Sequence, residues 1–474
     1  ADIRSVSGHI TVSVDDDIDG NADIATADGS VFLWAGNGTA DGAPNDGINL
    51  ADGTVIDSGN GNVRLLAGNE SDVWLNQVLA GAGSVSVVAG RDILDTNGTS
   101  NNVTASVLRL AADSNGDLGG QIGTPLGADS ETNDTAIDTA VDILAAISAD
   151  GIHINEADDV SLDLTGAITV SQVNFNSTLS IRTDTSLSDL ETTEAGHIKV
   201  VSMAGSITVN EGDSDDTGIK SSGDGDILLK ARGDDSSVTI NADIRRENGG
   251  LTVTADDDID INADISAVMS NWGVYLHAMN ETIDGAPNDG VNLAAGTILQ
   301  SGNRNVRIIA VNESDIWLNQ IVVGDGGVNL EADRNIFDNN GAANNVTAKV
   351  LRIKADANGD FAGQIGASDI ANGDAILNQN AIDTDVDVFG GVSADGIYIQ
   401  EADDLAIDET GSGTFGISAN IINVNASVSI LNTGMLSDIE TTDDGPIKLV
   451  TLSGSVTINE GDADETGVSA GTSG

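Results

Sequence analysis

Residues 61–68 read GNVRLLAG, and residues 83–90 repeat the pattern as GSVSVVAG. In both segments aliphatic residues occupy alternate positions between two glycines, which is typical of a half-buried β-strand. A third segment, GSVFLWAG at 29–36, follows the same pattern. No amphipathic helical stripe of more than a turn or two separates these segments. The sequence therefore predicts an all-β protein of short strands that recur at nearly constant spacing.

The spacing of the strands favours one all-β architecture. Segments that begin at residues 8, 29, 61, 83 and 104 are separated by steps of 21, 32, 22 and 21 residues. Blocks of roughly 20–24 residues with several short strands suit the coils of a parallel β-helix, in which Gly, Asn and Asp form the corners. A β-sandwich needs hairpin signals every 8–12 residues or so, and Asn-Gly and Asp-Gly pairs leave that alternative open. We predict a parallel β-helix, or solenoid.

The chain also contains two copies of a longer unit. NESDVWLNQ at 69–77 returns as NESDIWLNQ at 312–320, and DGAPNDG at 41–47 returns unchanged at 284–290, each after 243 residues. We predict two tandem units of about 245 residues, 1–241 and 242–474, that continue into one rod. Because the second copy stops where the first continues, we expect the chain to be a window of a longer array.

Composition excludes several classes of partner. The chain has 76 Asp and Glu against 18 Lys and Arg, a net charge of -58, no Cys and 39% hydrophobic residues. A nucleic-acid-binding protein needs a basic surface, and anionic membranes attract basic clusters. No stretch approaches the roughly 18 apolar residues of a membrane span. We therefore predict no nucleic-acid partner and no direct membrane insertion.

Acidic clusters are the strongest polar feature. D-x-N-G-D, DDDID and NEGD-[SA]-D each occur in both copies, so oxygen ligands recur at alternate positions. Such ligands suit Ca²⁺, although the glycine position and the absent glutamate differ from an EF-hand loop. The alternative is a solvated acidic turn. Ca²⁺ is the one cofactor predicted, with these candidate ligands: Asp113, Asn115, Asp117, Asp356, Asn358, Asp360, Asp15, Asp17, Asp19, Asp256, Asp258, Asp260, Asp213, Asp215, Asp462 and Asp464.

The repeated DGAPNDG peptide lies inside the long step of 32 residues. Its Asp-Gly, Ala-Pro and Asn-Asp-Gly pairs are turn-forming, which predicts a loop that protrudes from the regular coils. Exposure makes this loop a candidate for contact with a neighbouring fibre or another partner. The candidate contact residues are Asp41, Pro44, Asn45, Asp284, Pro287 and Asn288.

Catalytic patterns are weak. The four histidines correspond to Gly250, Tyr398, Pro446 and Trp34 in the other copy, so no histidine is duplicated. Carboxylate pairs of the kind that a glycosidase uses arise by default in so acidic a chain. The aromatic residues that would form a sugar-binding platform amount to 3%. We predict that the protein is not an enzyme, and a polysaccharide-degrading β-helix enzyme is the least favoured alternative.

The segments ADGIHINEADDVSLDLTG at 149–166 and ADGIYIQEADDLAIDETG at 394–411 carry a resemblance to known proteins. They resemble repeats of filamentous-haemagglutinin-like and other giant β-strand-repeat surface proteins of bacteria. The resemblance implies a right-handed β-helix, export to the bacterial cell surface, and roles in adhesion, surface layers or matrix. It implies no catalytic residues.

Together these features predict a structural repeat segment of a large exported protein, part of an extracellular fibre, adhesin stalk or matrix filament. The expected partners are other copies of the chain or further repeats of the same array. The alternative is a Ca²⁺-dependent adhesion module that binds a glycan or a protein on a host or neighbouring cell through the DGAPNDG loops.

Overall fold

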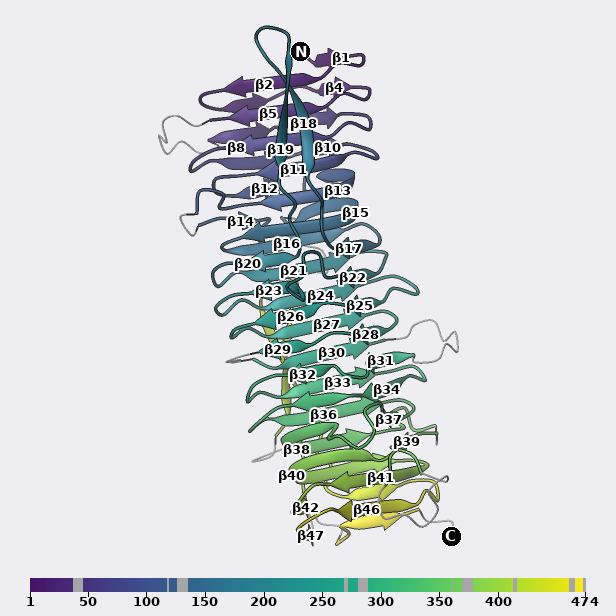
Figure 1. The fold of residues 1–474 in the computed structure, drawn as a ribbon. Helices are drawn as coiled ribbons and strands as arrows, with labels where there is room; N and C mark the ends of the chain where they lie inside the picture. The colour runs from purple at the N-terminus through teal and green to yellow at the C-terminus, as the bar shows by residue number, and fades with distance from the viewer. Residues whose placement is uncertain are drawn as a thin grey trace. The chain divides into compact units, whose positions relative to one another are not determined.

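A computed structural model shows a parallel β-helix, in which short strands of successive coils pair side by side (Figure 1). It describes residues 1–36, 46–116, 119–125, 135–267, 272–279, 289–360, 362–368, 378–411, 416–459 and 465–471. All regular structure in these ranges is β-strand, and none of it is a helix suited to crossing a membrane. The all-β class and the parallel β-helix predicted from the sequence are confirmed.

The chain divides into two compact units. One contains Ala1–Lys230 with Asn423–Ser427, and the other contains Ala231–Ile422 with Val428–Gly474. Within each unit the strands form three parallel ladders. Most coils contribute one short strand to each ladder, whereas the longer strands Val103–Ala111 and Val346–Lys354 each pair in two ladders. Such ladders satisfy the backbone hydrogen bonds of a strand through the coils on either side of it.

In the first unit the first four coils supply the opening strands of all three ladders. For the third ladder the later strands are given as well. The first ladder contains β1(Ile3–Ser5), β4(Ile24–Thr26), β7(Val55–Asp57) and β10(Gln77–Leu79). The second contains β2(Ile10–Val14), β5(Val31–Ala35), β8(Val63–Ala67) and β11(Ser84–Val88). The third contains β3(Ile18–Gly20), β6(Gly47–Leu50), β9(Asp72–Leu75), β12(Ile93–Asp95), β14(Gln121–Ile122), β16(Gly151–Glu156) and β21(His197–Ser202). The other parallel strands are β13(Val103–Ala111), β15(Ile137–Ser148), β17(Val160–Leu162), β20(Leu190–Thr192), β22(Ile207–Val209), β23(Thr217–Ser221) and β24(Ile227–Ala231).

The second unit repeats this arrangement. Its first ladder contains β26(Asp243–Arg246), β29(Ile265–Ala267), β32(Ile298–Gln300) and β35(Gln320–Val322). Its second contains β27(Leu251–Ala255), β30(Val274–Ala278), β33(Val306–Ala310) and β36(Gly327–Ala332). Its third contains β25(Val238–Ile240), β28(Ile259–Ile261), β31(Gly290–Leu293), β34(Asp315–Leu318), β37(Ile336–Asp338), β39(Gln364–Ile365), β41(Gly396–Glu401) and β46(Ile447–Thr451). The remaining parallel strands are β38(Val346–Lys354), β40(Ile382–Ser393), β42(Leu405–Ile407), β45(Ile439–Thr441), β47(Val456–Ile458) and β48(Val468–Ala470).

The pairing register confirms the steps predicted from the sequence. Ile10 pairs with Val31, Val31 with Val63 and Val63 with Val85, which are steps of 21, 32 and 22 residues. The coil length read from the glycine-flanked segments is therefore the spacing of hydrogen-bonded neighbours.

An aliphatic column fills the interior of the coils. Leu33, Leu65, Val87 and Leu110 are consecutive partners in the register, and all four are fully buried. Burial of each such side chain contributes about 1.5–3 kcal/mol relative to exposure. Alternation along each strand places Leu65 in this column and its neighbour Arg64 on the outer surface.

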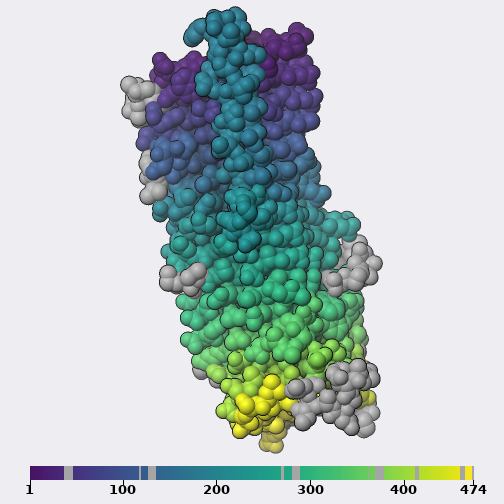
Figure 2. Space-filling model, in the orientation of Figure 1, coloured from purple at the N-terminus to yellow at the C-terminus, as the bar shows by residue number. Residues whose placement is uncertain are grey.

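Each unit also carries one antiparallel hairpin, which the coil periodicity did not predict. In the first unit β18(Ile168–Val173) pairs with β19(Leu179–Asp184), and β18 lies against β2, β5 and β11. Figure 2 shows this hairpin as a teal strip over the purple and blue coils. In the second unit β43(Ser418–Ile422) pairs with β44(Val428–Asn432), and β43 lies against β27, β30 and β33. The hairpins cover the outer face of the second ladder.

Candidate functional site

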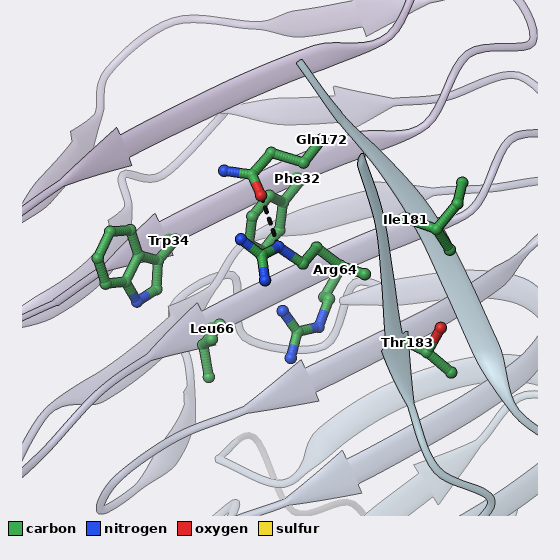
Figure 3. A pocket seen from close by; sticks show the side chains of 8 residues that line it. Phe32, Trp34, Arg64, Leu66, Gln172, Ile181 and Thr183 are labelled. Carbon is green, nitrogen blue, oxygen red and sulfur yellow. Dashed lines mark hydrogen bonds between the residues drawn. The ribbon is translucent and has the colours of Figure 1, made fainter. Parts of the chain in front are cut away.

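A cavity of about 480 Å³ lies between the first hairpin and the outer face of β5 and β8; we call it the hairpin cavity. Phe32 and Trp34 from β5, with Leu66 from β8, form its apolar side (Figure 3). Ile181 and Thr183 of β19 also line the cavity, and their side chains point away from the aromatic side in Figure 3. The remaining lining residues are Arg64, Gln172 and Arg182. The cavity thus combines aromatic surface with amide and guanidinium groups.

The base of the hairpin is fixed by Asp184. Its carboxylate accepts hydrogen bonds from Arg64 at 2.8 and 2.6 Å and from the Ser86 hydroxyl at 2.7 Å. These contacts hold the pKa of Asp184 below its usual value, although burial opposes them. The Arg64 guanidinium also lies 5.2 Å from the centre of the Phe32 ring. Arg64 is therefore held by an ion pair and a ring contact.

Arg182 is placed differently. It is exposed on β19, and its Nε donates a hydrogen bond of 2.5 Å to the Gln172 side-chain carbonyl on β18. A neutral amide orients the guanidinium without cancelling its charge. The hairpin cavity therefore presents one oriented cation at its rim.

The second copy closes the corresponding space with apolar side chains. Residues 172 and 182 correspond to Ile421 and Leu431, 249 positions later, the offset that also relates LSDLETT to LSDIETT. Ile421 and Leu431 pack against a buried cluster of Tyr275, Ile309 and Ala419. The same backbone arrangement thus carries a polar cavity in one unit and a filled apolar contact in the other.

Two of the predicted Ca²⁺ ligands come together with a carboxylate that the sequence did not nominate. Oxygen atoms of Asp189, Asp213 and Asp215 lie within 4.8 Å of one another. Asp189 is 9% exposed, and its Oδ1 is buried without a hydrogen-bond partner. Burial, reinforced by the charges of Asp213 and Asp215, raises the pKa of Asp189 to about 7. This group, the Asp189 cluster, is a candidate metal centre of oxygen ligands.

A second acidic group in the described residues contains Asp385, Glu401 and Asp403. Here the buried carboxylate is satisfied: Glu401 accepts hydrogen bonds from the Thr384 hydroxyl at 2.7 Å and from the Ala402 amide at 2.9 Å. Its first-copy counterpart, Glu156, is bound by Thr139, Val141 and Ala157 in the same way. These glutamates hold the neighbouring backbone in place through hydrogen bonds. The group of Asp385, Glu401 and Asp403 therefore has no buried oxygen without a partner, unlike the Oδ1 of Asp189.

In the DDDID clusters, aspartate side chains accept hydrogen bonds from backbone amides of the neighbouring coil. Asp17 and Asp258 accept hydrogen bonds from the Gly47 and Gly290 amides at 2.7 and 2.6 Å. Among the described residues only the two groups above bring three such ligands within 4.8 Å, so the DDDID carboxylates do not gather. This set comprises Asp15, Asp17, Asp19, Asp256, Asp258 and Asp260. Fixing Gly47 and Gly290 matters because both have positive φ angles where the long coil resumes.

The D-x-N-G-D segments form turns beside a glutamate. Asp113 and Asp356 have φ angles of 57° and 60°. Asn115 donates to Glu70 at 3.4 Å, and Asn358 donates to Glu313 at 3.2 Å. Asp360 accepts from the Ala362 amide at 3.1 Å. A Ca²⁺ ion at these turns stays a prediction.

Several predicted residues lie outside the described residues. They are Asp117, Asp462 and Asp464 among the candidate ligands, and Asp41, Pro44, Asn45, Asp284, Pro287 and Asn288 among the candidate contacts.

Sequence reasoning missed Asp189, Glu156, Glu401 and the residues of the hairpin cavity. A signal existed for Asp189, because LSD recurs in both copies next to an invariant ETT. For the cavity the signal was a difference between the copies and not a repetition: Gln172 and Arg182 change to Ile421 and Leu431.

Comparisons of this chain with family models, with curated proteins and with solved structures gave no match.

Proposed function

We propose that this chain is a structural repeat segment of a large exported surface protein and forms part of an extracellular fibre, adhesin stalk or matrix filament without catalysing a reaction. The observation that carries this proposal is the duplicated β-helix itself. Backbone ladders and an aliphatic column join each coil to its neighbours. Such a structure grows in length by duplication of coils without a change in design.

The outer strands of the second unit support self-association. Among the described residues, β47 pairs with β42 alone and β48 with β45 alone. Ile458 on β47 is 59% exposed and Val468 on β48 is 42% exposed. Unpaired strand edges with exposed aliphatic residues act as templates for further strands. We propose that the chain associates with other copies of itself, or with further repeats of the same array, by strand pairing of this kind.

Immunogold electron microscopy of the organism that makes the protein tests this function. Antibodies raised against the purified chain are expected to label extracellular fibres or the cell surface at regular intervals. The control is the same antibody absorbed with the purified chain. Label confined to the cytoplasm would exclude the proposed role.

We also propose that the Asp189 cluster binds Ca²⁺. Asp189, Asp213 and Asp215 would hold the ion through carboxylate oxygens, the ligands that Ca²⁺ prefers. The ion would give the buried Oδ1 of Asp189 a partner and would offset the repulsion of three nearby carboxylates. The second copy carries Asp438, Asp462 and Asp464 at the corresponding positions.

Calcium titration tests the Asp189 cluster. At a Ca²⁺ concentration 100 times its Kd, we expect each occupied cluster to raise the unfolding free energy by about 2.7 kcal/mol relative to chelator-treated protein. Asp189→Asn is expected to remove that part of the gain which the first unit contributes, without destabilising the calcium-free chain, because it relieves repulsion. Asp403→Asn, in the satisfied group, is the matched control. An unchanged Ca²⁺ response in Asp189→Asn, or no response in the wild-type chain, would overturn the site.

A further inference from the structure

We infer that the hairpin cavity of the first unit binds a saccharide that carries a carboxylate. The inference goes beyond a fibre role, since it gives one unit a ligand that the other unit does not take. It depends on neither Ca²⁺ nor the DGAPNDG loops.

The cavity is not a by-product of packing the hairpin on the coils. Both units place an arginine at the same position of the second ladder, Arg64 and Arg307, and both lay a hairpin over it. In the second unit Ile421 and Leu431 fill the space against Tyr275. Apolar filling of this space gains stability by burial. In the first unit the polar residues Gln172 and Arg182 do not provide this stabilisation by burial, and a space of about 480 Å³ stays open.

The charge of the cavity selects an anion. Arg64 is paired with the buried carboxylate of Asp184, and Arg182 stands at the rim. The two lining arginines against the one negative charge of Asp184 leave an excess of one positive charge in a chain whose net charge is -58. Arg64 is engaged by Asp184, so Arg182 is the residue placed to receive a ligand carboxylate through a charge-assisted hydrogen bond. At physiological salt the screening length is about 8 Å, so the local arginine outweighs distant acids.

The rest of the lining suits a sugar ring. Trp34 is half-buried on β5, so part of its indole faces the cavity (Figure 3). Aromatic surface packs against the C–H faces of a ring, while the Gln172 side-chain amide offers a hydrogen bond to a ring substituent. A few convergent polar groups on an apolar wall are the usual makeup of a small-molecule site.

Calorimetric titration with an oligogalacturonate, in chelator-containing buffer, tests the inference. The wild-type chain is expected to bind, and the double variant Gln172→Ile with Arg182→Leu is expected to bind about tenfold more weakly or not at all, because it copies the side chains of the second unit. Arg245→Leu is the matched control, since it removes one positive charge from a half-exposed position in the second unit. Thermal melting of each variant confirms that it is folded.

Matched probes separate the ligand classes. The methyl-esterified oligogalacturonate is expected to bind at least about tenfold more weakly than the acid, because the ester cannot accept a charge-assisted pair from Arg182. Equal binding of acid and ester would overturn the role of the carboxylate. Equal binding of polyglutamate or inorganic phosphate would overturn the saccharide class, and wild-type binding that the double variant retains would overturn the location. Absence of wild-type binding would overturn the inference while leaving the fibre proposal to the immunogold result.

Discussion

A chain that lacks residues 306–327 is expected to fold, whereas a chain that lacks residues 306–316 is expected to lose the fold of its second unit. The longer deletion removes β33, β34 and β35, which together make one complete coil. Val274 then meets Val328, the partner of the deleted Val306, and Leu299 meets Val346, the partner of the deleted Ile321. Every ladder closes with its register intact.

The shorter deletion has the opposite effect although it removes half as many residues. It joins Asn305 to Trp317, so the second ladder loses β33. The chain then passes from the first ladder directly to the rest of β34, which belongs to the third ladder. The aliphatic column then loses its alignment, and each buried side chain displaced costs about 1.5–3 kcal/mol. Circular dichroism and urea unfolding of both chains provide the measurement. Unfolding of the 22-residue deletion, or native-like unfolding of the 11-residue deletion, would contradict a structure of interchangeable coils.

Replacement of Glu156 with glutamine is expected to stabilise the chain above pH 7 and to flatten its pH dependence. Glu156 is fully buried, and burial raises its pKa to about 7 from an ordinary value of 4.5 despite three hydrogen bonds. The folded state therefore holds the proton more tightly than the unfolded state. The stability that comes from the neutral carboxyl is complete below about pH 4.5 and is lost as the pH rises through 7. At about 1.4 kcal/mol per pKa unit, the loss is on the order of 3 kcal/mol.

Glutamine reproduces the neutral form. Its carbonyl can accept from the Val141 and Ala157 amides, and its amide can face the Thr139 hydroxyl. Urea unfolding at several pH values between 4 and 9, compared with wild type, gives the measurement, and Glu440→Gln on the exposed face of β45 is the control. Parallel stability curves for Glu156→Gln and wild type would show that Glu156 stays ionised in the folded state.

The candidate site illustrates the limit of inference from spacing. The NEGD-[SA]-D repeat identified Asp213 and Asp215 as candidate ligands. Their partner Asp189 lies 24 residues before Asp213, on the preceding coil. Coil periodicity says that such residues are near one another; it does not say which side chains converge at a corner. The DDDID clusters show the other outcome, since Asp17 and Asp258 turn to backbone amides instead of to one another.

The sequence by itself determined the all-β class, the parallel β-helix, the coil steps and the duplication. It could do so because each strand pairs with the strand one coil away. The spacing of Val31, Val63 and Val85 along the sequence is therefore also the spacing of paired residues. Only the tertiary structure decided the hairpins, the position of the buried Asp189 carboxylate, whose Oδ1 has no hydrogen-bond partner, and the hairpin cavity. The hairpins and the hairpin cavity depend on segments whose separation is not a coil length, as with Arg64 and Asp184, 120 residues apart. Proximity of that kind follows from how the hairpin lies across the ladder, which no local period encodes. The Asp189 cluster lies on adjacent coils, but which of their side chains converge is decided by the conformation of the corner.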